Sequence, residues 1–589
     1  KMYINTLHSK TNTFACYKNK INYLIWGIIM IKKSHGNLKK FTIILLVFTL
    51  LILPLSFAEG DYTLPNVEKH INVTDDGTTI ISEDITYSIS GTINGVYRDV
   101  GLSGDQRLEN ISVETPGYYN TLEVINSSNK VKIKVHLYKD EAKTEKVSDE
   151  DVRVIYHYNF IKGVKIYDDI AELQYKSWGS DWDSDVDNLV TYIQIPGSHN
   201  NIEMWNNPQY IVKESTWTSD DTLKTQFKPL SSGQFAEQRI LMPKEYFKST
   251  QNADVIHKNA KAQIEQDQKE YQESQENHNI LMKFLSLFAI LGILSPIPIY
   301  IKYGREPKIE YNEKYEMDLP TKHSPVFVNT IIEGAIGETD EYGFQASLLD
   351  LIDKKYYKII SSNEDDVVLK QKDKDMSLLK QYEIDIVDYL SKFKDDEGHI
   401  SLSSMDSVEF SKFMDAWKID VNKEVNSLEV RKLFNNRGNQ VASLVYALLL
   451  ISGLIIIIYS SLTKGDYNNI ALVLGVILTI ESAIVFALPD TIFGQWTSEG
   501  KEFHDKWKNF EKYIKDYSLI KEYPPASIQV WGKYLVYATA LGCASEASGN
   551  MKKYFKYINL PEEQYYESDA VFFSMYGGNM FMHSLLHDP

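Results

Sequence analysis

Glu481 is the side chain whose position most clearly suggests chemistry, because it lies in an otherwise uncharged apolar run from Ile470 to Leu488. A charged carboxylate near the middle of a membrane span costs on the order of 3 kcal/mol on insertion scales. Such a residue usually faces protein or water, which makes Glu481 a candidate protonatable or partner-pairing site within the membrane. The alternative is a packing role, with Glu481 protonated or bonded to Ser443, Tyr446 or Ser452.

Four aspartates at alternate positions form a second candidate, since carboxylate oxygens are the ligands that calcium prefers. They are Asp181, Asp183, Asp185 and Asp187. An EF-hand loop needs Gly at its sixth position and Glu at its twelfth, where this sequence has Val186 and Tyr192. We therefore favour a solvated loop between strands.

Cys543 and His504 could in principle act as nucleophile and base, but the sequence supplies no orienting third group and no nucleophile elbow. Phosphate-binding Gly-rich loops, HExxH zinc sites and G-x-S-x-G elbows are also missing from the sequence. We predict no catalytic, cofactor-binding or metal-ligating residues and no cofactor, and we favour a protein that is not an enzyme.

Length and charge limit the protein class. A chain of 589 residues is too long for one hydrophobic core, so several domains are expected. The net charge of -18 disfavours nucleic acid as a partner, because phosphate backbones reward clustered Lys and Arg. The two cysteines, Cys16 and Cys543, lie outside the region assigned below to the outer side, which excludes a disulfide framework there.

The N-terminal part has the pattern of a secretory signal. Lysines after Met30 precede an uncharged apolar run from Phe41 to Phe57, and the small-x-small sequence ending at Ala58 fits a cleavage site. We predict cleavage after Ala58 and suspect that translation begins at Met30. An uncleaved anchor is the alternative. In both cases the chain beyond residue 58 lies outside, because the lysines stay inside.

Three later apolar runs are long enough to cross a bilayer: 280–301, 441–460 and 469–488. Lys302 and Arg305 follow the first run, and Arg431, Lys432 and Arg437 precede the second, so both flanks are expected in the cytosol. Three N-x-Ser/Thr sequons all fall in the predicted outer segment, and they mark possible glycosylation sites at Asn72, Asn110 and Asn126.

The outer segment has the period-two pattern of strands with one buried face. Apolar residues alternate with polar residues at 131–137, 152–160, 85–89 and 189–195, and Gly, Asn and Asp punctuate these runs. We predict an antiparallel β-sandwich. Residues 253–279 are rich in Ala, Gln, Glu and Lys without a clear apolar stripe, which suggests a solvated helical stalk.

The cytosolic part alternates helix and strand. An amphipathic helix around Phe344–Ile352 precedes two short strands, Tyr356–Ile360 and Val367–Lys370, which is the outline of a winged-helix module. Residues 303–440 hold 28 Asp and Glu against 19 Lys and Arg, so protein contact is favoured over DNA binding. Two further helices are predicted through Phe503, Trp507, Phe510 and Ile514, and through Trp531, Tyr534, Leu535 and Ala538. Their aromatic residues fit a core or a membrane-surface position.

Several stretches around the spans resemble one family. They are Gly95 to Val100, Trp182 to Val190, Tyr303 to Pro307, Ser347 to Ile352, Trp496 to Gly500 and Tyr534 to Gly542. In order and spacing the chain is similar to the domain-of-unknown-function 2207 family of predicted membrane proteins over most of residues 60–560. The resemblance implies a signal, an outer β-domain, a span, a cytosolic domain and a closing hairpin, and it brings no assigned activity. A Gly-rich C-terminal tail is reduced here to Gly577-Gly578.

The sequence thus predicts a multidomain α+β membrane protein of the cell envelope. The expected boundaries are 1–58 for the extension and signal, 59–252 for the β-sandwich, 253–279 for the stalk, 280–301 for the first span, 302–440 for the winged-helix-like domain, 441–460 and 469–488 for the hairpin, 489–560 for a cytosolic helical segment and 561–589 for a flexible tail. We expect the lipid bilayer and proteins on both sides as partners. A component of a membrane transport or assembly complex is the alternative function.

Overall fold

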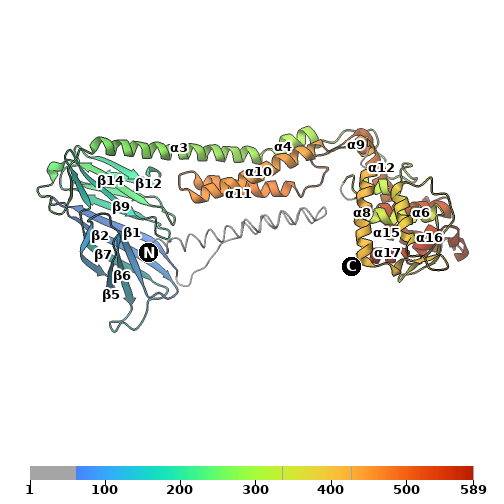
Figure 1. Ribbon diagram of the computed structural model, residues 1–589, viewed down its shortest axis with the longest axis horizontal. Coiled ribbons are helices and arrows are strands. Elements are labelled where there is room, and N and C mark those ends of the chain that lie inside the picture. The colour runs from blue at the N-terminus through green and yellow to red at the C-terminus, as the bar shows by residue number, and fades with distance from the viewer. Residues whose placement is uncertain (1–60, 334–335, 426–427, 588–589) are drawn as a thin grey trace. The chain divides into compact units, whose positions relative to one another are not determined.

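The computed structural model describes residues 61–333, 336–425 and 428–587, so the predicted signal and its cleavage position after Ala58 lie outside the described residues (Figure 1). The described chain divides into two compact units. The first contains the residues up to Ile290 together with Ser452–Ile477, and the second contains Leu291–Ile451 and the chain from Leu478 onward.

A β-domain occupies most of the first unit, in blue to green in Figure 1. Its strands are β1 (Asp61–Val73), β2 (Thr79–Ser90), β3 (Gly95–Gly101), β4 (Arg107–Glu114), β5 (Tyr119–Asn126), β6 (Lys130–Tyr138), β7 (Asp151–Ile161), β8 (Val164–Tyr167), β9 (Ala171–Trp178), β10 (Leu189–Gln194), β11 (Glu203–Asn207), β12 (Val212–Trp217), β13 (Thr222–Phe227), β14 (Ala236–Met242) and β15 (Asp254–Ile256). They form a seven-stranded sheet (β12-β13-β10-β1-β2-β7-β4), a five-stranded sheet (β11-β14-β9-β8-β15) and a three-stranded sheet (β3-β6-β5).

The period-two pattern in the sequence correctly locates four of these strands. In β2, β6, β7 and β10 the predicted apolar positions are buried and the polar positions between them are more exposed. The inward-facing residues make one shared core, as expected for a β-sandwich-like domain. The prediction of a purely antiparallel arrangement is wrong, because β10 pairs with β1 in parallel and β15 pairs with β8 in parallel. Long crossover connections through other strands make these parallel pairs possible.

Helix α3 (Lys261–Ile293) leaves the β-domain and continues into the first apolar run. Its N-terminus is capped by Asp169, whose carboxylate accepts hydrogen bonds from the backbone N–H groups of Ala260 (2.8 Å) and Lys261 (3.1 Å). Ile264 is buried against β-domain residues in the next turn. The prediction of a solvated stalk is therefore wrong for the first turns of α3, because these turns pack on the β-domain.

Among the described residues, three helical segments are long and apolar enough to cross a membrane: Lys261–Gly304, Arg437–Leu462 and Asn468–Val485. They contain α3, followed by α4 (Pro296–Ile299) and the short π-helical turn Tyr300–Gly304, and then α10 (Arg437–Leu462) and α11 (Asn468–Val485). Large apolar side chains on their surfaces are exposed, such as Leu444 and Ile455. Lipid is the medium that such surfaces suit.

The second unit holds a mainly helical domain after the first apolar run. Its first part contains α5 (Pro325–Ile332), α6 (Glu341–Asp353), β16 (Tyr357–Ser362), β17 (Val367–Gln371), α7 (Gln381–Ser391), β18 (His399–Ser401) and α8 (Ser407–Val425). The predicted helix followed by a β-hairpin is present as α6, β16 and β17, and β18 adds a third strand beside β17. A short helix α9 (Leu428–Leu433) and strand β19 (Phe434–Asn435) lead into α10.

The first four helices after the hairpin are α12 (Ser498–Lys515), α13 (Tyr517–Glu522), α14 (Ile528–Ala540) and α15 (Ala544–Tyr557). Strand β20 (Gln495–Trp496) precedes them and pairs with β19. The aromatic residues at helical spacing are buried, including Trp507 in α12 and Trp531 in α14. The core position, one of the two alternatives for these aromatics, is the one that the structure shows.

The C-terminal segment differs from the predicted flexible tail. It forms α16 (Asp569–Met575) and α17 (Gly578–His587). Val571 and Phe573 are buried in the same core as α6 and α14. The sequence shows no periodicity here because a helix of seven residues followed by one of ten residues is too short to display a sustained stripe.

A candidate binding site in the β-domain

Two opposite charges face each other inside the β-domain. Lys69 in β1 and Glu83 in β2 are direct partners in the antiparallel ladder, and both side chains are fully buried. The alternation of each strand places them there, since Val67 and Ile71 flank Lys69 on the inward face. The Lys69 ammonium donates a hydrogen bond of 2.8 Å to Glu83 Oε1. An ion pair therefore occupies positions that apolar residues usually fill.

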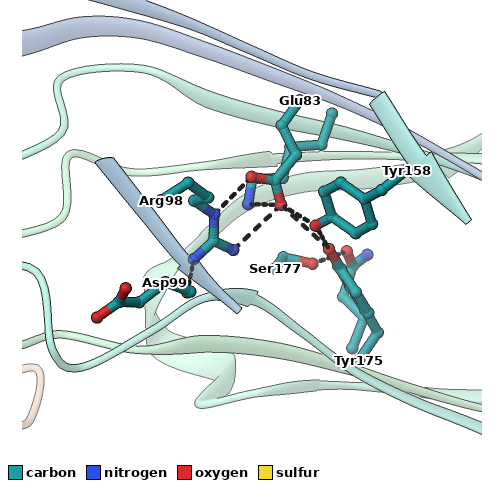
Figure 2. A network of polar contacts seen from close by, with 8 residues as sticks. Glu83, Arg98, Asp99, Tyr158, Tyr175 and Ser177 are labelled. Atoms are coloured by element: carbon teal, nitrogen blue, oxygen red, sulfur yellow. Dashed lines mark hydrogen bonds and ion pairs between the residues drawn. The ribbon is translucent and has the colours of Figure 1, made fainter. Parts of the chain in front are cut away.

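Arg98 from β3 and two tyrosines complete the cluster around Glu83 (Figure 2). The Arg98 guanidinium donates from Nε to Oε2 (2.6 Å) and from Nη2 to Oε1 (3.1 Å). The hydroxyl groups of Tyr158 in β7 and Tyr175 in β9 donate to Oε1 at 2.9 and 3.2 Å. Glu83 thus accepts five hydrogen bonds, from residues on four different strands. We call Lys69, Glu83, Arg98, Tyr158 and Tyr175 the ionic cluster.

The cluster holds one more positive than negative charge. Burial disfavours the charged form of Glu83, but Arg98 and Lys69 outweigh burial and hold the pKa of its carboxyl well below the ordinary value. Burial lowers the pKa of Lys69 to about 8, against the opposing attraction of Glu83. Burial also raises the pKa of the phenol groups of Tyr158 and Tyr175. Glu83 and Arg98 stay charged at neutral pH, and Lys69 is the member closest to titration.

Two tryptophans cover the cations of the ionic cluster. The Trp178 and Trp182 rings stack with centroids 4.4 Å apart. The Lys69 ammonium lies 5.3 Å from the Trp178 ring centroid, and the Arg98 guanidinium lies 5.9 Å from that of Trp182. Cation–π attraction favours both arrangements. Trp182 belongs to the aspartate-rich loop, so this loop is anchored on the cluster.

A cavity of about 550 Å³ opens beside the cluster, and we call it the main cavity. Arg98, Tyr175 and Trp182 line it, and Tyr62 and Tyr97 add two further aromatic rings. Carboxylates and lysines from β8, β9, β14 and the aspartate-rich loop also line it. Its size is within the range of small-ligand sites, which combine aromatic walls with a few fixed polar groups.

A second cavity of about 360 Å³ adjoins the main cavity, and we call it the stalk cavity. Asp267, Gln268 and Tyr271 of helix α3 form part of its wall. The two cavities share the lining residues Gln174, Lys176, Ser180 and Glu237. Together they make one groove that runs from Arg98 to the helix that enters the membrane segment.

Helix α3 is fixed to the groove by two amide side chains. Asn207 Nδ2 donates to Gln268 Oε1 at 3.1 Å, and Gln268 Nε2 donates to Asn207 Oδ1 at 2.7 Å. Both side chains are buried. A reciprocal pair of this kind fixes the rotation of α3 as well as its distance, because both amide planes must align.

The ionic cluster is suited to positioning and recognition rather than to proton transfer. The carboxylate of Glu83 is already saturated with donors, so it offers no free base. Arg98 is held by Glu83 on one edge and by the Asp99 carbonyl oxygen on another. A rigid, charged floor under an aromatic-walled cavity can orient a ligand.

The sequons, which are the predicted modification sites, lie on three strands. Asn110 in β4 and Asn126 in β5 are exposed, and Asn72 in β1 is half-buried. The structure does not bring them together with the ionic cluster. Their glycosylation stays a prediction.

Glu481 lies in α11, as the sequence indicates. Its Oε2 atom is buried and has no hydrogen-bond partner among the described residues. Tyr446, one of the three partners considered from the sequence, instead shares a hydrogen bond of 2.8 Å with Ser295. The hydrogen bond to Tyr446 that the packing alternative considered is therefore made by Ser295 instead.

The remaining chemical candidates from the sequence are the aspartate-rich loop, Cys543 and His504. Asp185 accepts a hydrogen bond from the backbone N–H of Ser232 (2.6 Å), and within the described ranges no three His, Cys, Asp or Glu side chains converge as they would around a metal ion. Cys543 is buried, and burial raises the pKa of its thiol. His504 pairs with Asp505 (3.0 Å).

Comparisons with known proteins identify one family. The N-terminal domain of a family described as "Predicted membrane protein (DUF2207)" matches residues 63–242, and its C-terminal domain matches residues 312–551. No curated protein matches the sequence.

Among solved structures, an M1 zinc metallopeptidase from Deinococcus radiodurans is 10% identical with a TM-score of 0.20, covering 32% of this chain and 43% of its own. A two-domain M1 zinc metallopeptidase bound to L-arginine is 8% identical with a TM-score of 0.20, covering 31% and 44%. The chain thus spans less than half of each, and TM-scores this low carry no argument about fold or activity.

Proposed function

Because this chain belongs to the predicted membrane protein family DUF2207, we propose that it is a non-enzymatic envelope protein that links an outer binding domain to protein-interaction domains in the cytosol. The groove beside the ionic cluster is the observation that carries this proposal. It combines a fixed charged floor, aromatic walls and a direct connection to helix α3. The saturated carboxylate of Glu83 supports binding rather than catalysis.

The proposed orientation places the β-domain outside and the second unit's soluble parts inside. Lys302 and Arg305 follow the first span, which supports a cytosolic position for what comes next. In the loop between α10 and α11, the Lys464 ammonium donates to the Ser232 carbonyl oxygen of the β-domain at 3.1 Å. This contact supports a hairpin whose loop lies on the same side as the β-domain. A cleaved signal ending at Ala58 and glycosylation at the sequons belong to the same proposal.

Photo-crosslinking tests the binding function. A photoreactive amino acid replaces Tyr97, which lines the main cavity and is 53% exposed. Tyr119 in β5 is the matched control, because it is a 43% exposed tyrosine that does not line the groove. We expect a specific adduct in intact membranes from position 97 and none from position 119. Equal capture at both positions, or none at either, would contradict the proposal.

Pull-down tests the cytosolic half of the proposal. After crosslinking in intact membranes, the second unit should retain a specific protein, and its acidic surface should make that retention salt-sensitive. Recovery of no protein beyond that seen with an unrelated membrane protein would count against a cytosolic interaction domain.

A transport or assembly component is the second candidate, and one observation favours it. Glu481 carries a buried oxygen that has no hydrogen-bond partner in the described part of the chain, which is a costly arrangement in an apolar span unless another helix or a ligand meets it. Substitution of Glu481 tests this candidate.

A further inference from the structure

The charges that line the groove nearly cancel. In the main cavity Lys165 and Lys176 have no ion-pair partner among the described residues, and neither do Asp181 and Asp183. Glu237 accepts hydrogen bonds from the amides of Gln174 and Asn207 but has no cation within ion-pair distance in the described chain, and the surplus positive charge of the ionic cluster offsets its charge. Asp267 in the stalk cavity bonds to Gln263 and also has no ion-pair partner there, so the groove keeps a small negative surplus. A groove lined by both positive and negative groups favours neither anions nor cations, because an ion of either sign meets groups of its own sign that repel it.

The groove presents unused donors and acceptors side by side. Gln174 (3.1 Å) and Asn207 (3.4 Å) both donate to Oε1 of Glu237, which leaves Oε2 without a partner in the described chain. The Tyr271 hydroxyl is buried in the stalk cavity wall and also lacks a partner there. The ammonium of Lys176, which lines both cavities, has no ion-pair partner in the described chain and is an unused donor. Hydroxyl groups match such a lining, because each one both donates and accepts.

Aromatic rings also line the main cavity. Tyr62, Tyr97, Tyr175 and Trp182 contribute them. The faces of aromatic rings carry partial negative charge and attract the slightly positive C–H groups on the face of a saturated ring. A ligand that matches both the polar and the aromatic lining has many hydroxyl groups around a ring with C–H faces, and it has no net charge. Saccharide rings have these properties.

We propose that the groove binds an uncharged oligosaccharide, with one ring against the aromatic wall near Trp182 and the chain extending past Glu237 to Tyr271 of α3. This inference rests on the proposed function of the β-domain as a binding domain, and it names the ligand class. Because α3 forms part of the wall, the bound chain contacts both the β-domain and the helix that enters the membrane.

Equilibrium binding to the full chain tests the proposal. The protein is placed in phospholipid nanodiscs, since detergents with sugar head groups would compete. The probes are the uncharged trisaccharides maltotriose, cellotriose and chitotriose, detected by saturation-transfer NMR and by the change in tryptophan fluorescence. We expect saturable binding of at least one. Saturable binding of none overturns the proposal.

Matched variants locate the site. Tyr97→Ala and Trp182→Ala should each weaken trisaccharide binding about tenfold or more, because each removes a ring from the wall. Tyr119→Ala and Trp217→Ala should leave it unchanged, since neither residue lines either cavity. Tyr97 is exposed, so its removal leaves the core intact even where the Trp182 variant is destabilised. Weakening by the controls as much as by the groove variants overturns the assignment.

Charged and peptide probes separate this inference from the proposed function. Trilysine, triglutamate and trialanine are tested in the same way. Tripeptide binding that is lost in Tyr97→Ala, without trisaccharide binding, overturns the saccharide proposal while the binding function stands. Absence of both, together with no adduct from position 97, overturns both.

Discussion

Lys69 and Glu83 lie directly opposite each other on adjacent strands with both side chains fully buried, and Arg98 approaches the same carboxylate from a different sheet. Glu83 is therefore the single anion that keeps two cations in the interior. Buried charges of this kind are stable only while they are paired and hydrogen-bonded.

Glu83→Gln should be strongly destabilising. It leaves the ammonium of Lys69 and the guanidinium of Arg98 without a counter-charge in a buried site, which should cost about 3–5 kcal/mol of unfolding free energy. Urea unfolding of the β-domain, followed by tryptophan fluorescence, measures it. Glu68→Gln on the exposed side of β1 is the control, and its effect should be about 0.5 kcal/mol or less. Equal effects of the two variants would show that the charge of Glu83 is not needed for folding.

Lys69→Met should be far milder than Glu83→Gln, because Glu83 keeps Arg98 as its partner. The pKa of Lys69 is about 8 in the folded state and about 10.5 in the unfolded chain, so only the unfolded chain holds this proton between those values. Stability should therefore rise with pH in that window, by up to about 1.4 kcal/mol per unit. Lys69→Met should remove this slope.

The measurement for Lys69 is best made between about pH 8 and pH 9.5, because buried tyrosines such as Tyr158 oppose the trend at higher pH. Their raised pKa values keep protons on the folded state after the unfolded chain has lost them. The difference between the parent and the Lys69→Met variant isolates the lysine. Parallel pH profiles of the two proteins would contradict a buried titrating Lys69.

The sequence predicts the strands of the β-domain better than it predicts the site they build. Alternation alone locates β6 and β7, and it also contained an unused signal, because Lys69 and Glu83 occupy inward positions between apolar residues. The alternation does not predict which strands lie next to one another or face one another. Tyr175 is 92 residues from Glu83, and their contact depends on which strands pack face to face. The resemblance marked the stretch around Arg98 but gave it no role.

In the helical regions, too, local patterns predict some elements but not the contacts that depend on packing. Aromatic spacing predicts α12 and α14 and their buried faces. Helices α16 and α17 were missed, because Phe573 and its neighbours gain their structure from packing on α6 and α14 rather than from a local pattern. The contact of α3 with the β-domain was missed for a related reason, since Asn207 and Gln268 are polar and their pairing is visible only in three dimensions.

Gln268→Ala should loosen helix α3 from the β-domain. It removes the two hydrogen bonds between Gln268 and the buried amide of Asn207, which should cost about 1–3 kcal/mol locally. Hydrogen exchange of the backbone amides in the first turns of α3 should speed up accordingly. Gln266→Ala is the matched control, because Gln266 is exposed and bonds only to Glu270 within the helix. Unchanged exchange in Gln268→Ala would show that the Asp169 cap, the ion pair of Lys261 with Glu203 and the packing of Ile264 hold α3 without the amide pair.

Single cysteines test the proposed orientation. Cys543 is buried, so an impermeant maleimide should label it slowly. Ser219→Cys in the loop between β12 and β13 should react in intact cells, whereas Ser411→Cys on α8 should react only after permeabilisation; both serines are exposed. Labelling of position 411 from outside, or protection of position 219, would reverse the orientation. Sequencing the mature N-terminus in the same preparation checks the predicted cleavage after Ala58.

Glu481→Leu tests whether the intramembrane carboxyl is retained for function. Removing an unpartnered carboxyl from an apolar span should stabilise the hairpin by up to about 3 kcal/mol. If Glu481 meets another helix or a ligand, the same variant should reduce the yield of crosslinked complexes, and Glu481→Gln should do so without the gain in stability. Ile484→Leu, on an exposed position of the same helix, is the control. A more stable Glu481→Leu protein with unchanged complexes would assign Glu481 to packing and remove the support for a transport or assembly role.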